Sequence, residues 1–203
     1  MACVGSRYAP ASVCERLDLV ESAEAPCVVI GQPSEISALG KVLEKRKPLA
    51  EKVGLTLSFF CAGSPSTRGT LDLMQRYHAE PSVTEYLRYR GFGWPGFFST
   101  RAKDEKDVTE HLVYGDAWAF LQKYRPYSTH LFPDGSGEDA DISCGDPWYR
   151  PVEAGEHGSS LIVVRTERGR ELLRRAMDAG VMVAKPATYG QLVKSQENLT
   201  RKR

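Results

Sequence analysis

The chain has 203 residues, 41% of them hydrophobic and 26% charged, an ordinary composition for a globular protein that can bury a sizeable core. Lysine and arginine number 27 against 26 aspartates and glutamates, so no charge excess indicates a nucleic-acid partner or a membrane surface. The sequence contains no apolar run long enough for a membrane span and no secretion signal at its start, which makes the cytoplasm the expected location.

The cysteines and the acidic residues do not predict a metal site. The cysteines are odd in number and form no C-x-x-C pair: Cys3, Cys14, Cys27, Cys61 and Cys144. We therefore expect small buried side chains instead of disulfides or zinc ligands. The acidic stretch 133–148 lacks the terminal bidentate glutamate of a calcium loop, so turn formation and backbone capping explain its carboxylates better.

The first recognisable element is a buried strand that is followed by a helix. Residues 1–24 give no clear pattern and stay unassigned, whereas residues 27–30 are apolar and β-branched and end at Gly31. The following turn begins a helix, for which Ser34 suits the N-cap position. Open α/β sheets bind ligands where their strands end, and the amides of the first helical turn point at such a site. This turn is therefore a candidate ligand loop.

A second buried strand is expected over residues 55–61, and a loop of small residues and a helix over 67–78 follow it. Cys61 stands at the end of this strand, as Ser34 stands just after the end of the first strand. It is either a residue that faces a bound ligand or a buried thiol, and the sequence leaves both interpretations open.

The stretch Tyr89–Gly96 is the most distinctive in the chain. Residues 85–90 alternate like a half-exposed strand, and residues 97–100 are expected to return as its hairpin partner. Three glycines and a proline between them cannot continue a helix or a regular strand. Trp94 offers a flat apolar face and Arg90 a planar charged fork, which favours a shaped binding loop. The alternative is a tight turn whose aromatic side chains only fill the core.

The second half of the chain predicts one more β-α unit. A strand over 161–166 precedes an amphipathic helix over 167–179, which has its apolar side chains inward and ends at Gly180. Residues 194–203 are polar and basic, so we expect a solvated tail. These elements predict an α/β fold, a single domain over residues 25–193 with a mixed β-sheet flanked by helices.

From Val28 to the C-terminus the chain resembles the coenzyme F420 hydrogenase/dehydrogenase beta subunit family. Five segments carry the resemblance in the same order: Gly31–Leu39, Phe60–Ser66, Tyr89–Gly96, Ala140–Trp148 and Gly158–Gly169. The resemblance implies an FAD-dependent oxidoreductase that transfers hydride or electrons between coenzyme F420, or a related donor, and an iron-sulfur or hydrogenase-type partner subunit. The cofactor-binding residues that it implies are Gly31, Pro33, Ser34, Cys61, Arg90, Gly91, Gly93, Trp94, Asp141, Gly145, Asp146, Ser159 and Arg165.

The chain departs from this family at its cysteines. Family members carry a cysteine where Ser34 stands, and an Arg-Cys-x-x-Cys-Pro-Asp motif where this chain reads Ser128–Asp134. We also expect the chain to lack the cysteine-rich, ferredoxin-like portion that many relatives have upstream. Because thiolates are the usual ligands of iron-sulfur clusters, no cluster is expected within this chain.

Two further functions stay open beside the flavin oxidoreductase. The lost cysteines fit a non-catalytic module that binds flavin or another subunit of a redox complex. A hydrolase that uses Ser34 would need a histidine base, and none of the four histidines lies in a telling sequence context. No catalytic residue is assigned from the sequence.

Overall fold

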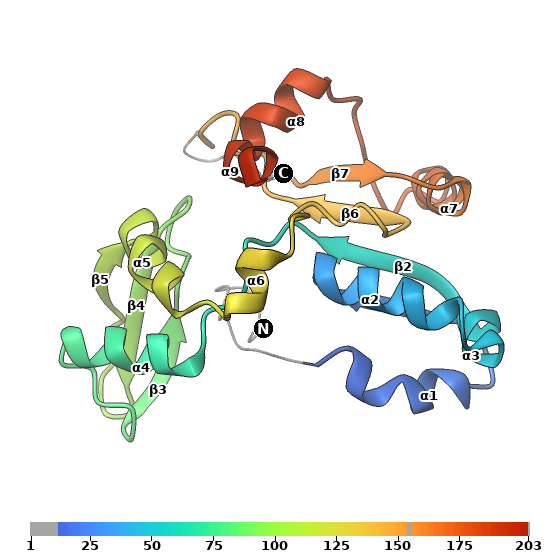
Figure 1. Cartoon of the computed structure of the whole chain (residues 1–203). Coiled ribbons are helices and arrows are strands. Elements are labelled where there is room, and N and C mark those ends of the chain that lie inside the picture. Colours follow the sequence, from blue (N-terminus) through green and yellow to red (C-terminus); the bar gives the residue numbers. More distant parts are fainter. Residues whose placement is uncertain (1–11, 154–155, 203) are drawn as a thin grey trace. The chain divides into compact units, whose positions relative to one another are not determined.

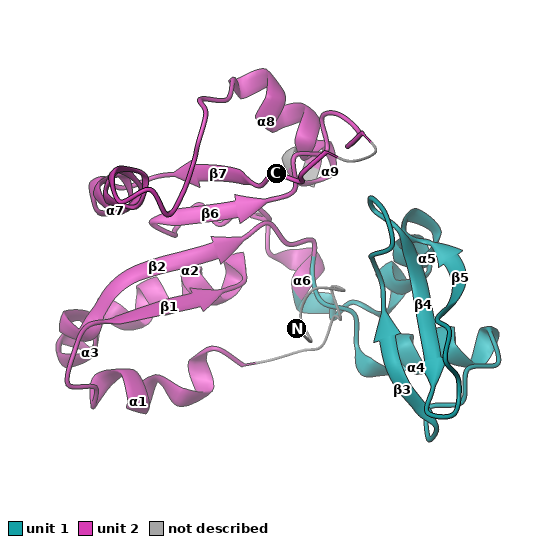
Figure 2. Ribbon diagram, turned by 180° about the vertical axis from the view of Figure 1, so that it is seen from behind, with its two compact units in different colours: residues 1–11, 63–128 teal, residues 12–62, 129–203 magenta. Residues whose placement is uncertain are grey.

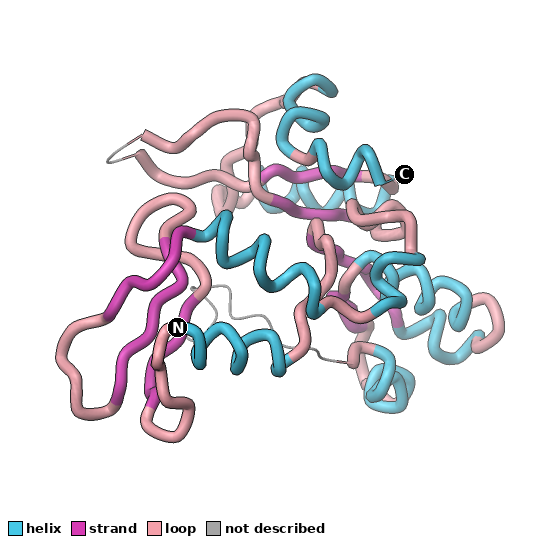
Figure 3. The backbone as a smooth tube through the Cα atoms, turned by 60° about the vertical axis from the view of Figure 1, so that its left-hand side comes forward, coloured by secondary structure: helices cyan, strands magenta, loops and turns pink. Residues whose placement is uncertain are grey.

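The computed structural model describes residues 12–153 and 156–202, which form two compact units (Figures 1 and 2). Unit 1 contains residues 63–128, and unit 2 contains residues 12–62 together with the chain from 129 onward. Unit 1 is thus an insertion in the sequence of unit 2. The chain contains both helices and strands, which loops connect (Figure 3). The predicted α/β class is therefore confirmed. The strands form two separate sheets, whereas the sequence predicted one.

Unit 2 is built on a mixed sheet with the strand order β1-β2-β6-β7. Its strands are β1 (Cys27–Gly31), β2 (Val53–Phe59), β6 (Ile142–Gly145) and β7 (Leu161–Val164). The first three strands are parallel, with Val29 opposite Thr56 and Ser58 opposite Ser143, and β7 pairs antiparallel with β6. The strands β1 and β2 were expected from their apolar runs, but β1 is not buried on both faces, since Val28 and Ile30 are 55% and 57% exposed.

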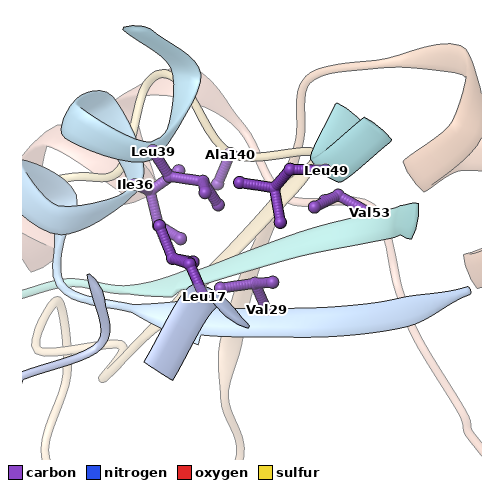
Figure 4. Packing of buried hydrophobic residues seen from close by; sticks show 7 residues of the cluster. All are labelled: Leu17, Val29, Ile36, Leu39, Leu49, Val53 and Ala140. Carbon is purple, nitrogen blue, oxygen red and sulfur yellow. The ribbon is translucent and has the colours of Figure 1, made fainter. Parts of the chain in front are cut away.

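The core of unit 2 lies between this sheet and the helices that pack on it. These helices are η1 (Cys14–Arg16), α1 (Leu17–Glu21), α2 (Pro33–Leu43) and α3 (Lys47–Lys52). Figure 4 shows the buried cluster of Leu17, Val29, Ile36, Leu39, Leu49, Val53 and Ala140. Leu39 and Leu49 are fully buried, so the helical spacing of the apolar residues after Gly31 is explained by packing.

The C-terminal part of unit 2 differs from the sequence prediction in two ways. Helix α7 (Glu167–Asp178) was expected to bury its apolar stripe, but Leu172 is 43% and Met177 is 41% exposed. Residues 189–202 form α8 (Tyr189–Ser195) and α9 (Glu197–Lys202) instead of a solvated tail. The Thr188 capping box begins α8, and Ser195 is buried, which explains why this polar segment is helical.

Unit 1 is an antiparallel sheet with helices on one face. Its strands β3 (Thr84–Arg88), β4 (Phe97–Ala102) and β5 (Thr109–Val113) lie in that order. Helices α4 (Thr67–Arg76) and α5 (Tyr114–Leu121), with η2 (Gln122–Tyr124), bury a core that contains Leu73, Tyr89, Phe98 and Leu121. Both α helices lie in front of the sheet in Figure 1, and Figure 2 shows its opposite face, which no helix of unit 1 covers.

The short helix α6 (Tyr127–Leu131) connects the end of unit 1 to the return into unit 2. No helix in residues 12–153 or 156–202 combines the length and the hydropathy that a membrane span requires.

Candidate functional site

One edge of the sheet in unit 2 gathers most of the predicted site residues of that unit. The parallel strands β1, β2 and β6 end at this edge, and the antiparallel strand β7 begins there. This edge of an open α/β sheet is the usual place of ligand loops. The residues that the topology brings to it are Gly31, Pro33, Ser34, Cys61, Gly145, Asp146 and Ser159.

The amino end of α2, which lies at this edge, is already capped by its own side chains. Gln32, and not Ser34, is the N-cap, so the predicted role of Ser34 as the cap is wrong. The Glu35 carboxylate accepts a 2.7 Å hydrogen bond from the backbone N–H of Gln32, and the Gln32 side chain accepts one from the amide of Glu35. Pro33 is buried and has no N–H to donate. A ligand phosphate at this helix end would therefore meet a carboxylate.

The segment after β2 contacts both the end of β6 and the loop that precedes β6. The Phe60 N–H donates to the Cys144 carbonyl at 2.7 Å, and the Cys61 N–H donates to the Gly135 carbonyl at 2.9 Å. A side chain at Gly145 would place its Cβ 2.7 Å from the Phe60 ring, so glycine allows this packing. The half-buried Cys61 thiol lies 3.6 Å from the Gln32 side-chain oxygen. Cys61 is thus part of the edge, although it is not fully buried.

Asp141 and Arg165 lie at the other end of the sheet, where β6 begins and β7 ends. The Asp141 carboxylate is 3% exposed and accepts hydrogen bonds from the Thr56 N–H at 2.7 Å and from Arg168 Nη2 at 2.7 Å. Burial alone would raise the pKa of Asp141, but the hydrogen bonds from Arg168, Thr166 and Thr56 outweigh it and lower the pKa. Asp141 therefore connects β2, β6 and α7.

The Arg165 side chain fixes the loop that precedes β6. Its Nε donates to the Gly137 carbonyl at 3.1 Å, and its Nη2 donates to the carbonyl and the hydroxyl of Ser136 at 3.1 Å each. Asp134 shapes the same loop by accepting from the N–H groups of Ser136 and Glu138, as the turn chemistry predicted. The structure places Asp141 at the end of the sheet opposite the predicted ligand residues, whereas the Arg165 side chain reaches the loop whose Gly135 carbonyl accepts from the Cys61 N–H.

In unit 1 the stretch Tyr89–Gly96 forms a loop that is closed on itself. The Gly91 N–H donates to the Pro95 carbonyl at 3.2 Å, and Gly91 and Gly96 form an isolated β-bridge. Gly96 has φ +83°, and a Cβ there would lie 1.9 Å from the Gly91 carbonyl oxygen. The Tyr114 N–H donates to the Gly96 carbonyl at 2.9 Å, which attaches the loop to the start of α5.

An arginine of the closed loop lies over two aromatic rings, one in the loop and one at the start of α5. The guanidinium carbon of Arg90 lies 4.7 Å from the Trp94 ring centroid and 5.2 Å from the Tyr114 ring centroid. Phe92 is 56% exposed, so it does not fill the core, whereas Tyr89 is 1% exposed and belongs to the core. The geometry favours the binding-loop interpretation over a turn that only plugs the interior.

The sequence prediction missed three aromatic and basic residues of unit 1. Tyr114 completes the Arg90 stack, and Tyr86 and Arg88 lie on the face of the sheet opposite the core residues Leu87 and Tyr89. Tyr86 and Arg88 are two positions apart, so both side chains lie on one face of a strand. This spacing could have predicted them as neighbours from the sequence.

The described residues offer no support for a metal site or for a serine nucleophile. Within residues 12–153 and 156–202, no group of three or more histidine, cysteine, aspartate and glutamate side chains is arranged to hold a metal ion. The exposed Ser34 has no hydrogen bond to a histidine in the described part of the chain.

The chain thus consists of an α/β unit whose sequence is interrupted by an antiparallel unit that carries an arginine-aromatic loop. Residues 26–189 match the family model that describes the C terminus of the beta subunit of coenzyme F420 hydrogenase/dehydrogenase. The chain belongs to this family, and the expected family resemblance is confirmed.

A chain in a solved structure of the F420-reducing [NiFe] hydrogenase complex from Methanosarcina barkeri shares the fold. The two chains have a TM-score of 0.66 at 19% identity, and the match covers 98% of this chain. This chain spans 66% of the length of that neighbour. No curated protein sequence matches this chain significantly.

Proposed function

We propose that the chain is a flavin-dependent oxidoreductase subunit. It binds FAD and takes part in hydride or electron transfer between coenzyme F420, or a related donor, and a redox partner. Membership in the F420 hydrogenase/dehydrogenase beta subunit family supplies the reaction class. The observation that carries the proposal is that the Arg90 guanidinium of the closed glycine loop lies over the rings of Trp94 and Tyr114.

The chemistry of the loop fits FAD. An isoalloxazine ring binds well against aromatic walls, and arginine neutralises a phosphate or the negative charge of a reduced ring. Gly93 has open space around the position of a Cβ, so a ligand can approach the backbone closely there. When bound, FAD would accept a hydride and pass its two electrons on one at a time. Arg90 and Trp94 would orient the FAD.

The sheet edge of unit 2, taken by itself, is a second candidate place for ligand contacts. Gly31, Cys61, Gly145, Asp146 and Ser159 stand at this edge and offer backbone and small polar groups. The capped amino end of α2 does not serve as the phosphate site in this proposal, because Glu35 places its carboxylate there. We therefore propose that an arginine side chain, that of Arg90, neutralises the pyrophosphate of FAD.

A partner subunit would hold the iron-sulfur clusters. Ser34, Thr129 and Phe132 stand where the family motifs have cysteines, and none of these side chains is a thiolate ligand. Electrons that leave the flavin one at a time would pass to an iron-sulfur or hydrogenase-type subunit of a complex.

Reconstitution with FAD tests the proposal. The purified protein should gain visible flavin absorbance, and Arg90→Ala and Trp94→Ala should each weaken FAD binding while Ser34→Ala leaves the fold intact. Unchanged FAD retention in both loop variants would contradict the assigned site. Oxidation of reduced F420 by the FAD-loaded protein then tests the reaction.

The non-catalytic interaction module is the second candidate, and exposed apolar side chains on unit 2 favour it. Val28 and Ile30 on β1 are 55% and 57% exposed, and α7 exposes Leu172 and Met177. Exposed apolar residues of this kind often mark contacts between proteins. A folded protein that takes up no FAD would support this candidate over the oxidoreductase.

A further inference from the structure

Arg88 lies on the face of the unit 1 sheet that is opposite α4 and α5. Its guanidinium carbon is 5.1 Å from the Tyr86 ring centroid and 5.9 Å from the Phe92 ring centroid. A Cβ on Gly91 would lie 3.2 Å from Arg88 Nη1, so the glycine leaves room for the guanidinium beside the closed loop. Both rings thus lie close to the guanidinium.

Arg88 has no anionic partner in the described part of the chain. In residues 12–153 and 156–202 it makes neither an ion pair nor a hydrogen bond through its side chain, although it is half-buried. Arg101, on the same face, lies 3.5 Å from Glu85, and Arg68 in α4 lies 3.8 Å from Asp72. A guanidinium that lies over aromatic rings can still offer N–H donors to a bidentate oxyanion.

Phe92 holds an exposed ring beside this guanidinium in an unfavourable backbone conformation. Its φ is +57°, in the left-handed region that an aromatic residue rarely adopts, and its side chain is 56% exposed. Its ring centroid lies 6.5 Å from that of Tyr86, with 42° between the ring planes. Such conformations persist where the surrounding structure enforces them and cluster at ligand clamps. Here the closed loop between Gly91 and Gly96 enforces it.

We propose that Arg88, Tyr86 and Phe92 form a second binding site, distinct from the Arg90 stack, for a ligand that carries a phosphate near a planar ring. The phosphate binds the N–H edge of Arg88, and the ring stacks on Phe92. The site does not depend on flavin binding at Arg90, because Arg90 has its own aromatic partners in Trp94 and Tyr114. Two sources carry this chemistry: the nucleotide end of FAD, and a separate ring-bearing phosphate substrate.

Calorimetric titration of the full-length chain with AMP tests the site, with adenosine and inorganic phosphate as probes for the ring alone and the anion alone. We expect AMP to bind at least about tenfold more tightly than either single probe, because stacking and the charged hydrogen bonds add. Arg88→Gln and Phe92→Asn should each weaken AMP binding about tenfold or more. Asparagine tolerates the left-handed φ at residue 92, so this variant removes the ring and keeps the loop.

Arg76→Gln is the matched control, since Arg76 also lies over a ring, at 5.7 Å from the Phe120 centroid, but on the helical side of unit 1. Its AMP affinity should equal that of the unchanged protein. The proposal is overturned if the chain does not bind AMP, or if the folded Arg88→Gln and Phe92→Asn variants bind it as the unchanged protein does.

A titration of the FAD-saturated protein separates the two sources. If FAD abolishes AMP binding, the site holds the nucleotide end of FAD. If AMP binding is unchanged, the site holds a separate substrate. AMP binding by a protein that takes up no FAD would support this site while the proposed flavin function fails.

Discussion

The backbone N–H of Thr56 donates a 2.7 Å hydrogen bond to the carboxylate of Asp141, which follows it 85 positions later in the chain. The Thr56 hydroxyl donates to the same oxygen at 2.9 Å, and Arg168 Nη2 lies 2.7 Å from it. One buried carboxylate thus connects a strand that precedes the insertion to a strand and a helix that follow it.

Asp141→Asn is expected to lower the free energy of unfolding by about 2 to 4 kcal/mol, because an amide cannot balance the Arg168 charge or accept all these hydrogen bonds. Urea denaturation measures the change. Asp178→Asn breaks an exposed ion pair with Arg174 and should cost less than about 1 kcal/mol. Since the pKa of Asp141 is lowered on folding, its contribution is complete above the ordinary aspartate pKa and is lost as the pH falls below it. Equal losses in the two variants would contradict the role of Asp141.

His111 should make the stability of unit 1 depend on pH. Its Nε2 lies 2.6 Å from the Thr100 hydroxyl, and its ring is 5.3 Å from that of Tyr77. Burial lowers the pKa of His111, and the charge of Glu105 opposes this only in part. Protonation therefore favours the unfolded chain, so this stability is complete above the ordinary histidine pKa of about 6.5 and falls as the pH drops below it.

The free energy of unfolding measured between pH 7.5 and pH 5, a range that brackets that ordinary pKa of about 6.5, checks this expectation. The His111→Asn variant should show a weaker pH dependence over this range than the unchanged protein. Parallel profiles for the two proteins would show that His111 is not the titrating group.

Gly96→Ala should open the closed loop. The new Cβ would lie 1.9 Å from the Gly91 carbonyl oxygen at a φ of +83°, so the loop must rearrange. We expect a loss of about 2 kcal/mol or more and weaker FAD binding. Gly115→Ala in α5 meets no atom within 4 Å and should be stabilising by up to about 1 kcal/mol. Similar melting temperatures for both variants would contradict the geometry of the loop.

Glu35→Ala should weaken the start of α2. The Glu35 carboxylate accepts the Gln32 N–H at 2.7 Å, and losing this half of the capping box should cost about 1 kcal/mol. Ser34→Ala, one residue earlier and exposed, should change stability by less than about 0.5 kcal/mol. Thermal denaturation of the pair measures the difference, and a larger effect at Ser34 would mean that the cap is assigned to the wrong residue.

The sequence predicted those helices and strands that a local pattern of residues identifies without knowledge of which strands pair. Strands β1, β2 and β7 are apolar runs, and α7 shows a clear helical period, so each was found. Strand β6 was missed because it includes the buried Ser143 and follows an acidic stretch that is typical of turns. Strand β5 was missed because it begins with the polar residues Thr109, Glu110 and His111, so its sequence lacks a clear alternation of apolar and polar residues.

The site was predictable only in part for the same reason. The closed loop could be expected because its glycines and aromatic residues are adjacent in sequence. The positions of Asp141 and Arg165 depend on the antiparallel direction of β7, which no local pattern reveals. The insertion also escaped detection, because the small-residue segment around Gly63 equally fits a short loop between a strand and a helix.

The two ends of the inserted unit are joined within that unit, where the Ser66 N–H donates to the Tyr124 carbonyl at 3.0 Å and the Tyr124 hydroxyl donates to Asp72 at 2.7 Å. Strands β2 and β6 pair in parallel across the insertion, so an unfolded insertion would impose a large loop-closure entropy on that pairing. Once unit 1 has folded from its own consecutive strands, the chain ends that lead to β2 and β6 are already close. A substitution that slows the folding of unit 1 should therefore also delay assembly of the unit 2 sheet, although the substituted residue lies in no strand of that sheet.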